Sequence, residues 1–325
     1  MGKASVILLA GILLCNACSN KPQRDGGSEG AASGTGDGLR GEIQLSGAFA
    51  LYPMAVKWAE EFKKTHPHVR FDVSGGGAGK GMTDVLAGVV DIGMVSREIY
   101  PEETNKGAFG IATVKDAVVL TINAGNPDLA SLKKIGLKKS TARRLWNGEF
   151  KTWGEALGTD SKVPVHVFTR SDACGAAATF AAWFDARQEQ LKATAVFGDP
   201  GVADAVRKDK AGVGYNNIAY AYDQKTKKTY AGIDILPLDV NENGVIEPEE
   251  DFYQSTESLI EAINDGRYPS PPARDLYFVT HGKPTKPEVI AFLEYVLSEG
   301  QQFAGETGYI RLSDAKLEEE LRKLN

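Results

Sequence analysis

Hydrophobic residues along the chain follow two periods in turn. Short apolar runs of strand length alternate with segments in which apolar residues recur every three or four positions, the spacing that places them on one helix face. Strands are expected at residues 42–46, 69–74, 92–95, 118–123, 163–170, 212–215 and 276–279. Helices are expected at residues 51–66, at a segment carrying Met82, Val85, Leu86 and Val89, at 140–146, at a segment carrying Phe180, Trp183 and Phe184, and at 199–208, 255–265, 287–298 and 313–324. This alternation predicts an α/β protein with parallel or mixed sheets. The run at 118–123 is apolar without alternation, which is typical of a parallel strand covered on both faces.

A glycine-rich turn lies between the second strand and the second helix, at residues 75–81. Glycine lets the backbone approach a ligand closely, and the first amides of a helix have no partner within the helix. Together these features favour an anion site at the start of the helix. A tight turn without any ligand remains the alternative.

Composition narrows the class of protein. A chain of 325 residues is long enough for about two domains, and 42% apolar with 25% charged residues is ordinary for a soluble globular protein. The net charge of -6 argues against nucleic acid as a partner, because a phosphate backbone is bound by basic surfaces. Of the three cysteines only Cys174 lies in the folded part, so we expect no internal disulfide there.

The N-terminal segment is typical of an export signal. Lys3 precedes an apolar run at residues 4–14, which is too short to span a membrane. Ala17 and Cys18 resemble a bacterial lipoprotein processing site, so Cys18 is the expected lipidated residue and residues 1–17 the signal peptide. The glycine- and serine-rich residues 18–40 are then a flexible tether. This predicts a protein on the periplasmic side of the cell envelope that touches the membrane only through its lipid; a cleaved signal without lipid is the alternative.

Residues 239–250 match the twelve-residue calcium loop of EF-hands position by position. Oxygen-bearing side chains stand at positions 1, 3 and 5, glycine at position 6 and glutamate at position 12. We therefore expect one structural calcium ion, inserted outside any paired EF-hand because the preceding residues 233–238 look extended. An Asn-Gly turn in an acidic loop is the alternative. The expected ligands are Asp239, Asn241, Asn243, the carbonyl of Val245, Glu247 and Glu250.

Three stretches taken together resemble a known family. Residues 46–53, residues 75–82 with 91–98, and residues 170–176 look like the ligand loops of phosphate-binding proteins from bacterial ABC transporters, and residues 146–153 and 213–217 fit the same family. The resemblance implies the two-lobed fold of type II periplasmic binding proteins. Lobe 1 would hold residues 41–116 and 275–325, and lobe 2 residues 117–274. Two crossings, near residues 114–118 and 273–277, would form the hinge, with the ligand in the cleft.

The resemblance also implies the ligand-binding residues. Arg170 matches the family's anion-clamping arginine and Asp172 the carboxylate that orients it, and the alternative is a surface ion pair. The family's hydroxyl donors are missing, and Ser96 stands where the family has a proton-accepting aspartate. Either Lys80, Arg97 and water compensate, or the ligand is not inorganic phosphate. The full expected set is Ala48, Phe49, Ala78, Gly79, Lys80, Ser96, Arg97, Arg170, Asp172, Cys174, Gly175 and Ala176.

The function expected from these features is solute binding. The chain would be a monomeric, lipid-anchored protein, not an enzyme, that delivers phosphate or a phosphate-like oxyanion to an ABC transporter permease. The same fold binding a small organic anion is one alternative. An enzyme is another, because a cysteine at a helix start near Arg170 should have a lowered pKa, and His166 is a conceivable base for Cys174. A surface scaffold without ligand is the third.

Overall fold

Two hydrophobic cores organise residues 38–325, the part of the chain that the computed structural model describes. The predicted signal peptide, the lipidation site Cys18 and the tether up to residue 37 lie outside the described residues. The first core is built around Trp58, Phe62 and Phe292, and the second around Trp146 and Phe180. Among residues 38–325, no helix is both long and apolar enough to pass through a membrane.

One mixed sheet runs through both cores. Its strand order is β2 (His68–Gly75), β1 (Arg40–Gly47), β3 (Ile92–Val95), β11 (Ala273–His281), β4 (Ala108–Asn123), β8 (Gly212–Asn217), β6 (His166–Arg170) and β7 (Thr194–Val196), with β9 (Ile233–Ile235) also paired to β4. A separate parallel pair joins β5 (Leu137–Lys138) to β10 (Leu238–Asp239). The α/β class with mixed sheets is confirmed.

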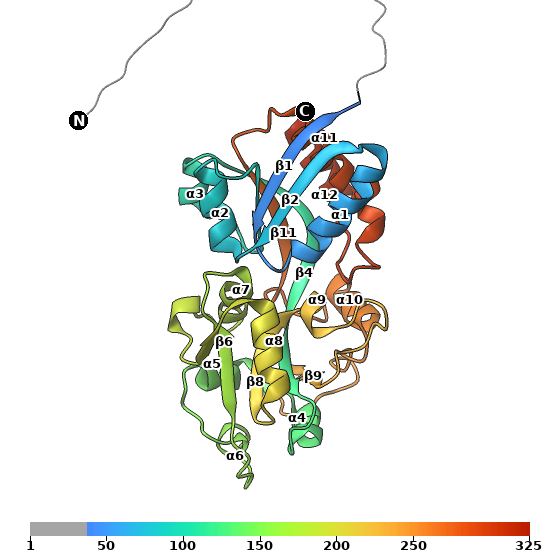
Figure 1. Ribbon diagram of the computed structural model, residues 1–325. Coiled ribbons are helices and arrows are strands. Elements are labelled where there is room, and N and C mark those ends of the chain that lie inside the picture. Colours follow the sequence, from blue (N-terminus) through green and yellow to red (C-terminus); the bar gives the residue numbers. More distant parts are fainter. Residues whose placement is uncertain (1–37) are drawn as a thin grey trace, which may run out of the picture. The chain divides into compact units, whose positions relative to one another are not determined.

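Strands β4 and β11 both run from one core into the other (Figure 1). Along β4, Val114 packs in the first core and Ala117 in the second. Along β11, Ala273 packs in the second core and Leu276 in the first, and the register with β4 shifts just after Leu276. The cores therefore change over at the predicted crossings, whereas the exact limits of the two lobes stay a prediction.

The direction of β4 differs from the prediction. Its partners β8, β9 and β11 are all antiparallel to it. The residues from Val118 to Ile122 are nonetheless buried, because helices α7, α8 and α9 pack against β4. An uninterrupted apolar run indicates that both faces of a strand are buried. It does not indicate whether the neighbouring strands run parallel or antiparallel to it.

Helices cover the sheet on both sides. Val89, expected on the second helix, lies beyond its end and is 61% exposed, because the helix stops at Leu86. The bounds are α1 Tyr52–Thr65, α2 Ala78–Leu86, α3 Pro101–Asn105, α4 Leu129–Ile135, α5 Lys139–Trp146, α6 Trp153–Leu157, α7 Gly175–Trp183, α8 Gly198–Lys208, α9 Ile218–Ala221, α10 Thr256–Asn264, α11 Pro287–Leu297 and α12 Asp314–Leu324, with short 3-10 turns at Gln188–Gln190 and Glu299–Phe303.

A buried arginine and a buried carboxyl group lie close together where β4 and β11 pass between the cores. Arg274 Nη2 is 3.5 Å from a carboxylate oxygen of Asp116, and Asp116 is 1% exposed. Arg274 also donates to Thr179 Oγ1 at 2.9 Å and to Asn217 Oδ1. Burial raises the pKa of Asp116 to about 7, although Arg274 opposes the shift.

This pKa predicts a pH dependence of stability. The folded state holds a proton on Asp116 up to about pH 7, whereas an unfolded aspartate releases it near pH 4, so Asp116 makes the free energy of unfolding fall as the pH rises through that window. Asp116→Asn should therefore flatten the decline. Urea unfolding at about pH 5 and about pH 8 measures the slope for both proteins; equal slopes would show that Asp116 does not titrate there.

Candidate functional site

Three strand-to-helix junctions meet between the two cores. Gly79 N, in the first turn of α2, donates to the carbonyl of Ala173 before α7 at 3.0 Å. At Gly175, a Cβ atom would lie 1.9 Å from the Ser96 carbonyl oxygen, so only glycine permits this approach. Gly77 has φ of +86°, and a Cβ there would lie 2.6 Å from Asp172 Oδ2. The structure thus brings together the loops that the sequence singled out.

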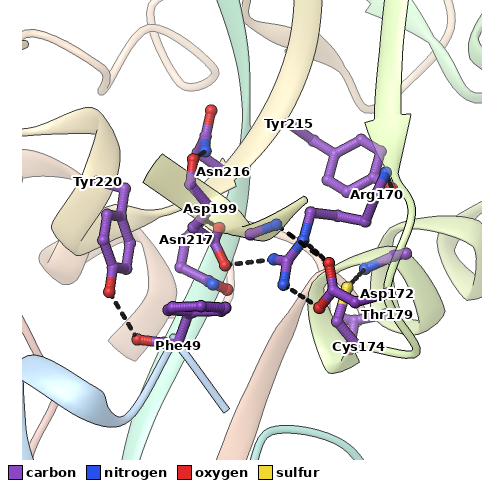
Figure 2. Close-up of polar contacts among 12 residues, drawn as sticks. Phe49, Arg170, Asp172, Cys174, Thr179, Asp199, Tyr215, Asn216, Asn217 and Tyr220 are labelled. Atoms are coloured by element: carbon purple, nitrogen blue, oxygen red, sulfur yellow. Dashed lines mark hydrogen bonds and ion pairs between the residues drawn. The ribbon is translucent and has the colours of Figure 1, made fainter. Parts of the chain in front are cut away.

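Arg170, the last residue of β6, is the centre of this region (Figure 2). Its Nε donates to Asp172 Oδ1 at 2.8 Å, its Nη2 pairs with Asp172 Oδ2, and its Nη1 pairs with Asp199 Oδ2. Its side chain is 1% exposed. The alternative of a surface ion pair is therefore wrong for Arg170 and Asp172.

The end of β6 is held in place by Tyr215 on the neighbouring strand β8. The Tyr215 hydroxyl accepts from Arg170 N at 3.2 Å and lies 2.7 Å from Thr169 Oγ1. Tyr215 itself is fully buried and stacks on Phe180 of α7, with 4.6 Å between ring centroids. The guanidinium therefore extends from a backbone position that core packing fixes.

Asp199 is the site residue that the sequence analysis missed. It lies in the first turn of α8, where its Oδ1 accepts from Asn217 N at 3.1 Å and its carbonyl accepts from Asn216 Nδ2 at 2.9 Å. It is 1% exposed. An aspartate in the first turn of a helix is common for capping and dipole reasons alone, so its position gave no signal of a contact with Arg170.

The Arg170 cluster, meaning Arg170, Asp172 and Asp199, holds one positive and two negative groups. Burial opposes the charge on Arg170, but Asp199 and Asp172 outweigh it and raise the pKa of the guanidinium above its usual range. Three of the five guanidinium N–H groups point at the two carboxylates, so two remain for a ligand. The cluster can thus present donors to an oxyanion but carries a net negative charge itself.

Phe49 covers the cluster from the first lobe's side. Its ring centroid is 5.5 Å from the Arg170 guanidinium and 5.8 Å from that of Phe197, edge to face. The Tyr220 hydroxyl donates to the Phe49 carbonyl at 3.0 Å (Figure 2). Its neighbour Ala48 is buried, as is Ala78 at the start of α2, and neither side chain offers a donor. The buried Ser96 does place a hydroxyl at these junctions, 2.3 Å from where a Cβ at Gly175 would stand.

Lys80 and Arg97 do not contact the Arg170 cluster. Lys80 pairs with Asp84 one turn further along α2. Arg97 donates twice to Glu103, at 2.9 and 2.7 Å, and stacks on Tyr100 with 4.1 Å from guanidinium to ring centroid. Either cation would have to leave its carboxylate before it could bind an anion beside Arg170.

A cavity of about 600 Å³ lies beside the junctions. Gly79 and Arg97 line it from one side, and Ala173, Cys174 and Gln188 from the other. Gln188 also donates to the Asp172 carbonyl at 2.6 Å and accepts from Cys174 N at 3.1 Å. The predicted loops thus border a space large enough for a small ligand.

The expected low pKa of Cys174 is wrong. The thiol caps α7, accepting from Ala177 N at 3.4 Å, and the residue is 5% exposed. Burial raises its pKa to about 12, although Arg170 acts in the opposite direction. His166 stands at the other end of β6, with its Nδ1 2.7 Å from Asp209 Oδ2. A thiol that stays protonated, with no base beside it, is not an activated nucleophile.

The 239–250 loop is flanked by Leu238 and Phe252, both of which pack in the second core. Its first residue, Asp239, ends β10, and its last, Glu250, is 7% exposed. Within residues 38–325, no group of three or more His, Cys, Asp or Glu side chains is arranged to hold a metal ion. The predicted ligand set includes three carboxylates, Asp239, Glu247 and Glu250, which therefore do not stand together as a metal-holding group in this structure, and the calcium site stays a prediction.

Comparison with known proteins gives a consistent result. A family model described as a PBP superfamily domain matches residues 30–300. The phosphate-binding protein PstS of Staphylococcus haemolyticus is 26% identical over 330 residues, covering 98% of this chain and 95% of that protein. PstS of Bacillus subtilis is 26% identical over 315 residues, covering 96% and 94%.

Solved structures show the same fold. A candidate phosphate ABC transporter substrate-binding protein of Clostridium perfringens, solved with bound phosphate, superposes with a TM-score of 0.69 at 21% identity, covering 84% of this chain and all of that one. An ABC-type phosphate transport receptor of Vibrio cholerae gives a TM-score of 0.58 at 18% identity, covering 82% and 99%.

Proposed function

Because the chain belongs to the PBP superfamily, we propose that it is an extracytoplasmic solute-binding protein that delivers phosphate or a phosphate-like oxyanion to an ABC transporter. The relatives that match almost its whole length are named phosphate-binding proteins, and a structural neighbour was solved with phosphate. These names describe binding and transport, and we propose the same for this chain rather than catalysis.

The observation that carries the proposal is the position of Arg170. Its guanidinium is buried between the junctions of α1, α2 and α7 and keeps two N–H groups free for a ligand. The starts of α2 and α7 add backbone amides that have no partner within the helix, although Gly79 N and Ala177 N are already bonded, to the Ala173 carbonyl and to Cys174 Sγ. Fixed donors from both sides of a cleft suit an oxyanion, and its binding would draw the lobes together as in hinge-type receptors.

A small organic anion is the second candidate ligand. Inorganic phosphate would find no side-chain hydroxyl at Ala48, Ala78, Cys174 or Ala176, and each hydrogen bond to a charged group is worth about 1.5–3 kcal/mol. The cavity beside the junctions, about 600 Å³, is larger than a single phosphate needs and is lined in part by alanines, with Arg97 and Arg187 rather than Arg170 as its lining arginines. A thermal-shift screen with phosphate, sulfate and small carboxylates and phosphonates separates the candidates, because a bound ligand raises the melting temperature. A screen in which no anion shifts it would favour a scaffold instead.

We propose that Cys18 carries the lipid that holds the protein, as a monomer, at the periplasmic face of a membrane. Cys18→Ser should release the protein from the membrane fraction into the soluble fraction, since one lost anchor removes the only proposed membrane contact. Cell fractionation with mass spectrometry of the mature N-terminus measures both location and lipid. Cys15→Ser is the matched control and should stay membrane-bound. A wild-type protein that carries no lipid would contradict the proposal.

A further inference from the structure

We propose that the 239–250 loop binds one calcium ion and that this ion fixes the loop to the second core. The site is separate from the Arg170 cluster, and the inference does not depend on the proposed function. The inference rests on two observations. The loop has the residue types of a calcium loop at its defining positions, and two of these residues are buried carboxylates that form no ion pair within residues 38–325.

The loop has the residue types of a calcium loop at each defining position. Asp239, Asn241 and Asn243 stand at positions 1, 3 and 5, and Glu250 stands at position 12. Position 6 is Gly244, whose φ of +88° a residue with a side chain rarely adopts. The ligands are all oxygen atoms, as calcium prefers, and none is the histidine or cysteine that zinc or copper would favour.

Both terminal carboxylates of the loop are buried without a counter-charge. Asp239 is 0% exposed and Glu250 is 7% exposed, and no lysine, arginine or histidine among residues 38–325 forms an ion pair with either. Taking a carboxylate out of water is costly unless a cation or several hydrogen bonds compensate. Their partners in the structure are backbone amides, among them Gly244 N with Asp239 at 2.7 Å and Val240 N with Glu250 at 2.8 Å. These hydrogen bonds compensate part of the cost of burial, and the Lys138 ammonium lies beside the loop, 3.5 Å from where a Cβ at Gly244 would stand, without forming an ion pair with either carboxylate. A bound cation would supply the direct counter-charge that both carboxylates lack among the described residues.

The predicted ligands form one connected group. Asn243 N donates to Asn241 Oδ1 at 2.9 Å and to Asp239 Oδ1 at 3.1 Å. Asn241 Nδ2 donates to Glu247 Oε2 at 2.9 Å, and Glu247 N lies 3.4 Å from Glu250 Oε2. The three carboxylates and two amides of this twelve-residue loop would have to draw closer together around an ion, and their number suits the six to eight oxygen ligands of calcium better than the strict octahedron of magnesium.

The loop is attached to the second core at both ends and in the middle. Leu238, which precedes it, is 1% exposed and donates from its backbone to the Tyr253 hydroxyl at 3.1 Å. β10 pairs with β5, and Ile246 N donates to the Lys134 carbonyl at 2.8 Å. Phe252, just after the loop, belongs to the same core. An ion that orders residues 239–250 would therefore stabilise the second core.

The test is a calcium titration of the full chain after treatment with a chelator. Calcium should raise the melting temperature by several degrees and give a one-to-one calorimetric isotherm, whereas magnesium at the same concentration should have much less effect. Glu250→Gln should weaken calcium binding at least about a hundredfold, because it removes the bidentate ligand. Glu249→Gln makes the same change at an exposed neighbour outside the ligand set and should behave as wild type.

Two outcomes overturn the proposal: a wild type whose melting temperature and calorimetric trace do not respond to calcium, or a Glu250→Gln protein that binds calcium as wild type does. If Glu250→Gln does not fold, Asn243→Ala serves instead, because Asn243 is exposed and its loss removes one ligand from the surface of the loop. That variant must also bind calcium more weakly than wild type. None of these readouts involves the transported solute, so their failure leaves the proposed function untouched, and the reverse also holds.

Discussion

Arg170→Ala is expected to lower the free energy of unfolding by about 3–5 kcal/mol and to abolish anion binding. The substitution leaves Asp172 and Asp199 buried, 8% and 1% exposed at their side chains, with no cation between them. Breaking a buried ion pair costs more than the pair contributes, because the remaining charge stays desolvated. Urea unfolding at neutral pH measures the effect on stability.

The matched control is Arg207→Ala in α8. Arg207 lies 3.5 Å from Asp204 in an exposed pair, so its loss should change the free energy of unfolding by less than about 1 kcal/mol. An Arg170→Ala protein as stable as the control would show that the cluster is not the buried, coupled group described above.

Asp199→Asn is expected to tighten anion binding by about tenfold or more. The asparagine keeps an oxygen for Arg170 Nη1, but the cluster loses one of its two negative charges, and charges a few ångströms apart interact by several kcal/mol in a buried site. Calorimetric titration with the best anion at low and moderate salt measures the change. Asp204→Asn, on the exposed face of the same helix, should leave the affinity within about twofold. Unchanged binding by Asp199→Asn would contradict the predicted repulsion, and weaker binding would mean that Asp199 assists the anion.

Much of the fold could be predicted because local signals agree with the tertiary structure. Strand β3 falls at Ile92–Val95 as expected, and helix α12 begins after the capping serine at position 313. Strand β4 is longer than predicted because Lys115 and Asp116 interrupt its apolar pattern, and Asp116 is buried through a pair with Arg274 that lies far along the chain. Local sequence carries no information about such a partner.

The candidate site likewise has one part that the sequence predicts and one part that it does not. Arg170 and Asp172 stand two residues apart in a recognisable loop, and the structure pairs them. Asp199 joins them from another helix, and only the packing of α8 beside β6 brings it there. For Cys174 the sequence predicted a pKa shift in the wrong direction. The helix start and the nearby arginine argued for a lowered pKa, but the depth of burial, which the sequence does not reveal, raises it.

The most direct measurement is calorimetric titration of phosphate, sulfate and small organic anions into the purified wild-type chain and Arg170→Lys. The lysine keeps the positive charge beside Asp172 and Asp199 but loses the planar fork. We expect at least one anion to bind wild type with one-to-one stoichiometry and salt-sensitive affinity, and Arg170→Lys, while folded, to bind it at least about tenfold more weakly. A wild type that binds no anion, or a lysine variant that binds as wild type does, would contradict an oxyanion site at Arg170.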